Sequence, residues 1–388
     1  MKKIVLLILT VFIVECAHGA PIELKELFRI KYKKQNEIAY SGRLFSLSKD
    51  YISLVMPNKY ALYSLEGKKI WESTGAKKVY GEMSGNGLWH ILEFQKRNDN
   101  EYFDYIYFLN KEGKVVWKKQ IDASPSISWD GERILLQKQA ETEYGGSILI
   151  DASGEEIPTN KELLKNEQFT YLTNTGNLLV LSSLPGKGGN IRKVIYSSNE
   201  QILREYMIKG GQGYDYQDAQ FVFTNSPDDY YIAVFQDNSQ ALDGGVIYRI
   251  NSFNNGELMW ESDKYGLDLG DIFYTASLSD GGKFFSFFDK KTSSVIYMDN
   301  IRGNVLWGKK INEFGNESVS HIKVSARGKY ILVVGNKDML VFNNLGQNIY
   351  QGKRTKNIIN IALSEGDTRL YMADDTTFYA YDISGILK

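Results

Sequence analysis

One short pattern recurs along the chain and constrains its fold more than any other feature: a glycine in a polar turn, followed four residues later by tryptophan. Apolar residues alternate before each glycine, as expected of a β-strand, and an aliphatic residue stands directly before each tryptophan. The four clear copies pair Gly67 with Trp71, Gly113 with Trp117, Gly256 with Trp260, and Gly303 with Trp307. Because these copies use four of the six tryptophans, the pattern predicts one repeated structural unit.

Weaker copies of the turn at Gly154, Asn199, Gly346 and Gly385 complete a series with a mean spacing of about 45 residues. A second polar turn, such as Asp280–Gly282, opens most units. Four strands of about six residues with four short connections need about 44 residues. The sequence therefore predicts an all-β fold, an eight-bladed β-propeller of four-stranded antiparallel blades, with seven blades as the alternative.

The two ends of the chain are predicted to share one blade. The last repeat unit ends near Gly385, at the point where its outermost strand is expected to begin. Residues 28–33 alternate apolar and basic side chains like the outer strands elsewhere, so a strand at about 26–33 is expected beside residues 378–384. That N-terminal strand would close the ring and remove an open sheet edge.

The first 19 residues have the features of an export signal. Lys2 and Lys3 precede an apolar run over residues 4–14, and small residues follow at Ala17 and Gly19. The run is too short for a stable membrane-spanning helix. We expect a signal peptide at 1–19 and a single propeller domain at 20–388, in a protein that is exported and either periplasmic, associated with the outer membrane, or extracellular.

Cys16, the only cysteine, stands at the end of the apolar run, where a bacterial lipoprotein signal carries its lipidated cysteine. Such signals have a small residue before the cysteine, and Glu15 is bulky and acidic. Removal of Cys16 with the signal and a lipid anchor on Cys16 therefore both stay open. In either case the folded domain has no cysteine with which to form a disulfide.

The residues offer little catalytic chemistry, and we expect no catalytic, cofactor-binding or metal-binding residue. Only His90 and His321 follow the signal, and both are interpreted as structural or surface residues. Residues 185–190 lack the spacing of a phosphate loop and are interpreted as a hairpin loop. The acidic pairs at 228–229 and 374–375, and the acids Asp268 and Asp271, are interpreted as solvated turns. A formal net charge of −1 argues against a nucleic-acid partner.

The interval between Asn199 and Gly256 is longer than the others, and its extra length lies around residues 210–216 and 237–245. Glycine and tyrosine together suit an adaptable contact loop, so Tyr214 and Tyr216 are candidate contact residues. A tolerated insertion without function is the alternative.

The alternating strand, glycine turn and tryptophan, as in Gly67-Lys68-Lys69-Ile70-Trp71, resemble the PQQ-like repeat of quinoprotein-like propellers, named for pyrroloquinoline quinone dehydrogenases. Those enzymes hold their quinone with a calcium ion and, in several, a vicinal cysteine disulfide. This chain has no cysteine for such a pair and no recognisable calcium site. In length, blade number and signal it is also similar to the non-enzymatic lipoprotein of the outer-membrane barrel assembly machinery.

Three functional hypotheses follow. The first is a non-enzymatic scaffold of the bacterial cell envelope that presents loops or a blade edge to a protein partner, as an outer-membrane assembly factor does. The second is a ligand-binding protein or quinoprotein-type enzyme that uses the axial pocket, which would gather polar and charged residues at the axis. The third is surface adhesion or carbohydrate binding, which would place exposed aromatic residues in one groove.

Overall fold

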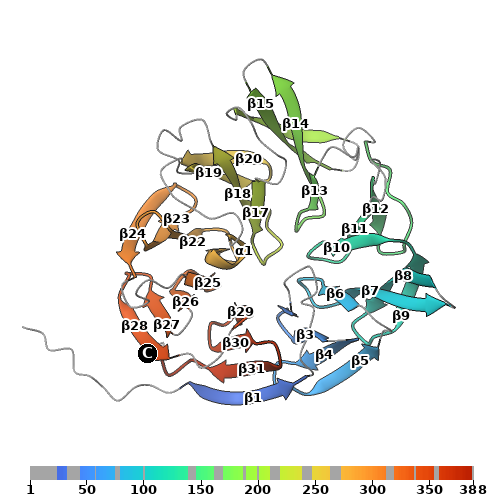
Figure 1. Ribbon diagram of the computed structural model, residues 1–388, viewed down its shortest axis with the longest axis horizontal. Coiled ribbons are helices and arrows are strands. Elements are labelled where there is room, and N and C mark those ends of the chain that lie inside the picture. The colour runs from blue at the N-terminus through green and yellow to red at the C-terminus, as the bar shows by residue number, and fades with distance from the viewer. Residues whose placement is uncertain are drawn as a thin grey trace, which may run out of the picture.

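The structure is a computed structural model that describes residues 24–32, 44–56, 58–74, 79–98, 101–138, 146–160, 169–186, 189–198, 201–209, 219–237, 247–262, 272–311, 319–335, 338–353 and 358–386. Eight antiparallel sheets follow one another around a ring (Figure 1). The eight-bladed propeller is thus confirmed over the seven-bladed alternative. We number the blades 1 to 8 in chain order.

Each blade is a meander of neighbouring strands. Blade 1 contains β2 (Phe45–Leu47), β3 (Tyr51–Met56), β4 (Lys59–Ser64) and β5 (Lys69–Thr74). Blade 2 contains β6 (Val79–Met83), β7 (Trp89–Asn98), β8 (Glu101–Asn110) and β9 (Val115–Gln120). Blade 3 contains β10 (Ala123–Ile127), β11 (Arg133–Lys138) and β12 (Ser147–Asp151). Blades 4 and 5 contain β13 (Phe169–Leu172), β14 (Leu178–Gly186), β15 (Gly189–Ser197), β16 (Ile202–Lys209); β17 (Ala219–Phe223), β18 (Tyr230–Asp237), β19 (Ile247–Asn254) and β20 (Glu257–Ser262). Blade 3 has three strands within the described residues, and an isolated bridge joins Ile150 to Glu156.

The second half of the ring repeats the same order. Blades 6 to 8 contain β21 (Ala276–Leu278), β22 (Phe284–Asp289), β23 (Ser294–Asp299), β24 (Asn304–Lys310); β25 (Val319–Val324), β26 (Tyr330–Gly335), β27 (Asp338–Asn343), β28 (Asn348–Lys353); β29 (Asn360–Leu363), β30 (Arg369–Ala373) and β31 (Thr377–Asp382). A short helix, α1 (Ile272–Thr275), leads into β21.

The fourth strand of blade 8 comes from the other end of the described chain. β1 (Lys25–Lys31) pairs antiparallel with β31, from Lys25 opposite Asp382 to Lys31 opposite Thr377. Figure 1 shows β1 as the outermost strand between blades 1 and 7. The first and last described strands therefore share one sheet, and blade 8 has no free edge at β31.

The core lies between blades. The two middle strands of a blade are almost continuously apolar and buried, because both of their faces are covered by neighbouring sheets. One hydrophobic cluster, for example, joins Phe288 and Val295 of blade 6 to Val333 and Leu340 of blade 7. Each blade is therefore stabilised chiefly by its neighbours.

The glycine and tryptophan of the repeat meet across the joints between blades. The Trp71 ring lies against Gly113 of the next blade, where a Cβ would approach the ring to 2.8 Å, and Trp71 Nε1 donates to the Lys111 carbonyl at 2.8 Å. Gly113 also has φ +78°, which favours glycine. The same docking joins Trp117 to Gly154, Trp260 to Gly303, and Trp307 to Gly346, and Phe28 of β1 lies against Gly67.

A second, inner series of joints follows the same rule. The residue that begins the second strand of a blade lies against a glycine in the first turn of the next, as Trp89 does on Gly131 and Phe284 on Gly328. Successive turns of a meander alternate between its two ends, so the first and third turns of every blade lie at one end of the ring. We call that end the glycine-turn face.

Candidate interaction surface on the outer rim

The outermost strand of seven blades contains a β-bulge at the same place. In blade 2, Phe108 pairs with Trp117 and Leu109 pairs with Val115, which leaves Val116 as the extra residue. The extra residues in chain order are Leu27, Ile70, Val116, Leu203, Met259, Leu306 and Ile349. Every one is apolar; five of them are exposed to water, whereas Met259 and Ile349 are half-buried.

Exposed apolar side chains of the described residues gather at this rim. Nine of the twelve large ones lie on outermost strands: Leu27, Ile70, Val115, Val116, Ile202, Leu203, Met207, Val305 and Leu306. The other three, Leu88, Ile301 and Leu345, lie in turns of the glycine-turn face. Because the bulge residues among them keep 37–49% of their surface accessible, the rim offers apolar area for binding.

Blade 4 departs from the repeat. Arg204 occupies the ladder position opposite Tyr196 that tryptophan occupies in blades 1, 2, 5 and 6, so β16 docks no indole on blade 5. Ile202, Leu203 and Met207 are all exposed on this eight-residue strand. Figure 1 shows the blade at the top of the ring, opposite β1.

A buried carboxylate joins blade 4 to blade 5 instead. Asp229 is 3% exposed and accepts hydrogen bonds from Thr173 Oγ1 at 2.8 Å, Tyr196 OH at 2.5 Å, the Thr175 hydroxyl, and the Thr175 amide at 3.0 Å. Burial, and then the bond to Asp229, raises the pKa of Tyr196 to about 12, so the phenol stays a donor. The prediction of a solvated turn at 228–229 is wrong for Asp229, because its partners come from another blade.

The turn at 374–375 is likewise not a solvated one, since Asp374 is 2% exposed. Tyr379 OH donates to Asp374 Oδ2 at 3.0 Å, and the Tyr32 hydroxyl donates to the Asp374 carbonyl at 2.5 Å. Burial alone would raise the pKa of Asp374, but hydrogen bonds from Thr376 and Tyr379 hold that pKa below its ordinary value. This turn thus fixes the end of the sheet that β1 joins. Asp268 and Asp271 lie outside the described residues.

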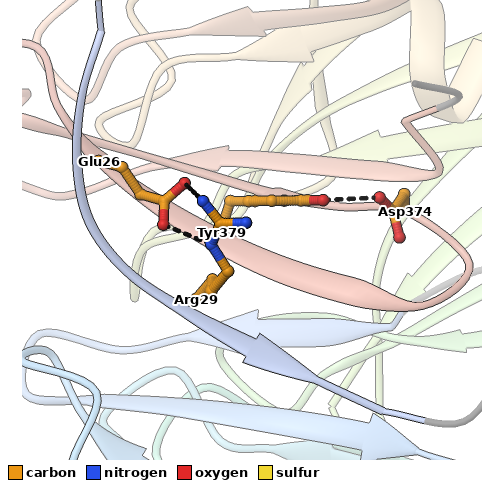
Figure 2. Close-up of polar contacts among 4 residues, drawn as sticks. All are labelled: Glu26, Arg29, Asp374 and Tyr379. Atoms are coloured by element: carbon orange, nitrogen blue, oxygen red, sulfur yellow. Dashed lines mark hydrogen bonds and ion pairs between the residues drawn. The ribbon is translucent and has the colours of Figure 1, made fainter. Parts of the chain in front are cut away.

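Two side chains of β1 continue this cluster along the rim. Arg29 forms an ion pair with Glu26, with Nε and Oε1 2.6 Å apart, and its guanidinium carbon lies 6.0 Å from the centre of the Tyr379 ring (Figure 2). Both charges face solvent, so the pair orients the closing strand more than it stabilises it.

The axis carries few ionisable side chains. On the eight innermost strands as described, the charged and histidine residues are Glu82, His321 and Lys323. His321 is 5% exposed and its Nε2 donates to the Ile359 carbonyl at 3.0 Å. Tyrosines 80 and 171 also lie on these strands.

His90 lies in the joint between blades 1 and 2, not at the axis. Its Nδ1 is 2.9 Å from Tyr60 OH, and its ring meets that of Trp71 edge-on at 5.0 Å. Burial lowers its pKa to about 3, which keeps the ring neutral. The structure therefore places both histidines among packing contacts.

The structure brings the predicted repeat residues together in pairs from different blades, as described for Trp71 and Gly113. Gly67 and Gly256 are exceptions, because Phe28 covers the first and Tyr196 of blade 4 covers the second in place of a tryptophan. Cys16, the signal segment 1–19, Tyr214 and Tyr216 lie outside the described residues. The hairpin predicted at 185–190 is confirmed, since β14 and β15 pair there with Pro185 opposite Asn190 and Gly186 opposite Gly189.

The described part of the chain contains neither a helix that could cross a membrane nor a group of residues that could hold a metal ion. No helix there has the length and apolar character needed to cross a membrane. No three or more His, Cys, Asp or Glu side chains of the described ranges are grouped so that they could hold a metal ion.

Comparison with known proteins shows the fold. No protein-family model and no curated protein matches the sequence. Among solved structures, BamB from Moraxella catarrhalis has a TM-score of 0.54 at 12% identity and covers 93% of this chain and 100% of its own. Dihydro-heme d1 dehydrogenase NirN, solved with DHE, has a TM-score of 0.53 at 11% identity, covering 93% and 77%. A eukaryotic initiation factor scores 0.52 at 14% identity, covering 88% and 83%.

This likeness shows a β-propeller, the fold that the glycine and tryptophan repeat predicts. The fold is shared by a dehydrogenase and by proteins of other kinds, so it carries no activity by itself.

Proposed function

We propose that the protein is a non-enzymatic scaffold of the bacterial cell envelope that binds a protein partner along the outer edge of blade 4, as an outer-membrane assembly factor. The observation that carries the proposal is the group of exposed apolar side chains on β16, Ile202, Leu203 and Met207, on a strand that docks no indole on its neighbour.

β16 suits a strand-pairing partner better than the other outer strands do. It is eight residues long, whereas the described outer strands of other blades have six or seven. Its outer edge leaves backbone N–H and C=O groups to be paired, and its exposed side chains give such a partner apolar contacts.

The distribution of side chains supports a scaffold over an axial enzyme. The large exposed apolar side chains of the described residues lie on the outer rim and on the glycine-turn face. The described inner strands, which surround the axis, carry only three charged or histidine residues. An enzyme that used the axis would gather polar groups there. The envelope location rests on the export signal expected at residues 1–19, and the assembly role on the likeness to BamB.

A capture experiment tests the partner. The tagged full-length protein is recovered from solubilised envelopes beside L203K/M207K and a matched variant, V305K/L306K, on the docked strand β24. We expect barrel-assembly proteins to be recovered with the wild type and with V305K/L306K. We expect L203K/M207K to lose these proteins. Absence of those proteins from the wild-type capture, or equal loss in both variants, would overturn the proposal.

A melting experiment tests the non-enzymatic part. A ligand that binds only the folded state raises the melting temperature. We expect added pyrroloquinoline quinone and calcium to leave the melting temperature unchanged, because we propose that the protein does not bind them. A rise of several degrees would refute this part of the proposal.

The anchor is tested separately. If Cys16 carries lipid, C16S releases the protein from membranes; if Cys16 is removed with the signal, C16S leaves its fractionation unchanged.

A further inference from the structure

A second part of the rim, formed by the outer strands of blades 8, 1 and 2, is strongly basic. We define this basic rim as β1 with residues 65–74 and 111–120. It contains four glutamates and nine basic residues: Lys25, Arg29, Lys31, Lys68, Lys69, Lys111, Lys114, Lys118 and Lys119. An excess of five positive charges lies here in a chain whose formal net charge is −1.

The basic rim is one continuous surface. Phe28 of β1 lies against Gly67, and Arg369 Nη1 of blade 8 donates to the Leu65 carbonyl at 2.7 Å, which holds the turn of blade 1 beside blade 8. Trp71 in turn donates to the Lys111 carbonyl of blade 2. Figure 1 shows β1, β5 and β9 following one another around the outside of the ring.

Several of the cations have no acid beside them. Arg29 pairs with Glu26, and Lys69 pairs with Glu72 at 2.9 Å. Lys114, Lys118 and Lys119 are exposed and form no ion pair with another described residue. Their charges remain available to an anionic partner.

Exposed apolar side chains lie on the same three strands. Leu27, Ile70, Val115 and Val116 are 40–49% exposed. Lysines around aliphatic groups suit the boundary between lipid headgroups and acyl chains, where cations meet phosphate and aliphatic groups leave water.

The opposite part of the rim has the opposite charge. The corresponding segments of blades 3, 4 and 5, at 152–160, 201–209 and 255–262, contain two basic and five acidic residues. In blade 6, Lys309 is already used within the protein, since its Nζ donates to the Gly346 carbonyl at 3.1 Å. Charge is therefore segregated around the ring, and one side can approach an anionic surface without repulsion.

We propose that the basic rim binds an anionic phospholipid bilayer edge-on, with its lysines against headgroup phosphates and its bulge aliphatics at the interface. Blade 4 then faces away from the bilayer, where a protein partner can reach β16. If Cys16 carries lipid, the nine-residue step from Cys16 to Lys25 spans roughly 30 Å when extended, which holds this same side at the membrane.

Vesicle flotation tests the proposal. All proteins are full length and carry C16S, so that no lipid on Cys16 contributes, and each is mixed with phosphatidylglycerol vesicles or with phosphatidylcholine vesicles. We expect binding to the anionic vesicles that falls with added salt. K118Q/K119Q lowers the partition coefficient at least tenfold, and V115S/V116S lowers it severalfold.

The matched control is R302Q/K310Q, which removes two exposed cations from blade 6 and is expected to change binding less than twofold. Equal melting temperatures show that the variants are folded. Failure to bind phosphatidylglycerol, or an equal loss in R302Q/K310Q, overturns the proposal. So does binding to polyglutamate without binding to vesicles, which would assign the rim to an acidic protein. Loss of the partner at β16 leaves these outcomes unaffected.

Discussion

Two joints of the ring are held by different chemistry. Between blades 6 and 7, the Trp307 indole covers Gly346 and donates to the Asn344 carbonyl at 3.2 Å, while Phe284 covers Gly328. Between blades 4 and 5, no tryptophan docks, and Asp229 gathers donors from Thr173, Thr175 and Tyr196. The inner turns of a joint can therefore be held either by an aromatic ring on a glycine, as Phe284 on Gly328, or by a buried polar network, as at Asp229.

The difference leaves β16 less firmly attached to the next blade than the strands that carry tryptophan. Where tryptophan docks, the outer strand is fixed to the next turn and its aliphatic groups flank the indole. Arg204 instead donates to the neighbouring Leu203 carbonyl at 2.9 Å, so nothing across the joint is held by this position. Tyr206 OH donates to Glu261 at 3.1 Å, which links β16 to β20 across the joint.

The largest effect is expected from W307A. Removing a docked indole leaves a cavity between two blades and an unpaired carbonyl at Asn344, and should lower the free energy of unfolding by about 3 kcal/mol. R204A, at the same ladder position of blade 4, should cost less than about 0.5 kcal/mol. Urea unfolding measures both. Similar losses in the two variants would show that the joints do not differ.

D229A should cost about 2–3 kcal/mol, because it leaves the hydroxyls of Thr173, Thr175 and Tyr196 without their buried acceptor. D228A is the matched control. The Asp228 side chain is exposed, and its removal leaves the Asp228 backbone carbonyl to accept the hydrogen bond from the Thr224 hydroxyl as before. Chemical unfolding followed by fluorescence distinguishes them. If D229A is as stable as D228A, the polar network does not hold the joint.

G113A should cost about 1–2 kcal/mol. Its φ of +78° is unfavourable for alanine, and the added Cβ would displace the Trp71 ring. G281A is the control, because a Cβ there meets no atom within 4 Å and its φ is not positive. Thermal melting gives the ranking, and a neutral G113A would mean that the indole docks without needing glycine.

The repeat could be read from the sequence because its causes are local. A turn with positive φ favours glycine, and the indole four residues further along the strand covers the glycine of the next blade, as Trp117 after Gly113 covers Gly154. The closing position of residues near Phe28 could be inferred from alternation alone. Fold class therefore followed from spacing.

The buried acids could not be read in this way. Asp229 is stabilised by Thr173, 56 residues away, and a sequence turn with two acids looks like any solvated turn. The exposed bulge residues were visible as the aliphatic position before tryptophan, but only strand pairing shows that Ile70 or Val116 faces water. The signal that could have identified blade 4 was the absence of tryptophan after Asn199.

The smallest effect concerns the inner turns of blades 6 to 8, where Asp280 is affected by the charges of two further acids, Asp367 and Glu365. Burial, and then the charges of Asp367 and Glu365, raises the pKa of Asp280 from 3.8 to about 6. A carboxyl whose pKa rises on folding contributes stability that is fully present below pH 3.8 and is lost as the pH rises through 6.

D280N should therefore be more stable than the wild type at pH 7.5 by about 1 kcal/mol, and the difference should disappear near pH 4. His90 changes stability in the opposite direction, since burial lowers its pKa from 6.5 to about 3 and stability is lost as the pH falls below 6.5. Comparing the two proteins at each pH cancels the His90 contribution. The carboxylate of Asp229 accepts hydrogen bonds from the neighbouring blade, whereas Asp280 is affected by the charges of other acids. If the stability difference between D280N and the wild type is the same at pH 4 and at pH 7.5, this contrast between the two sides of the ring does not hold.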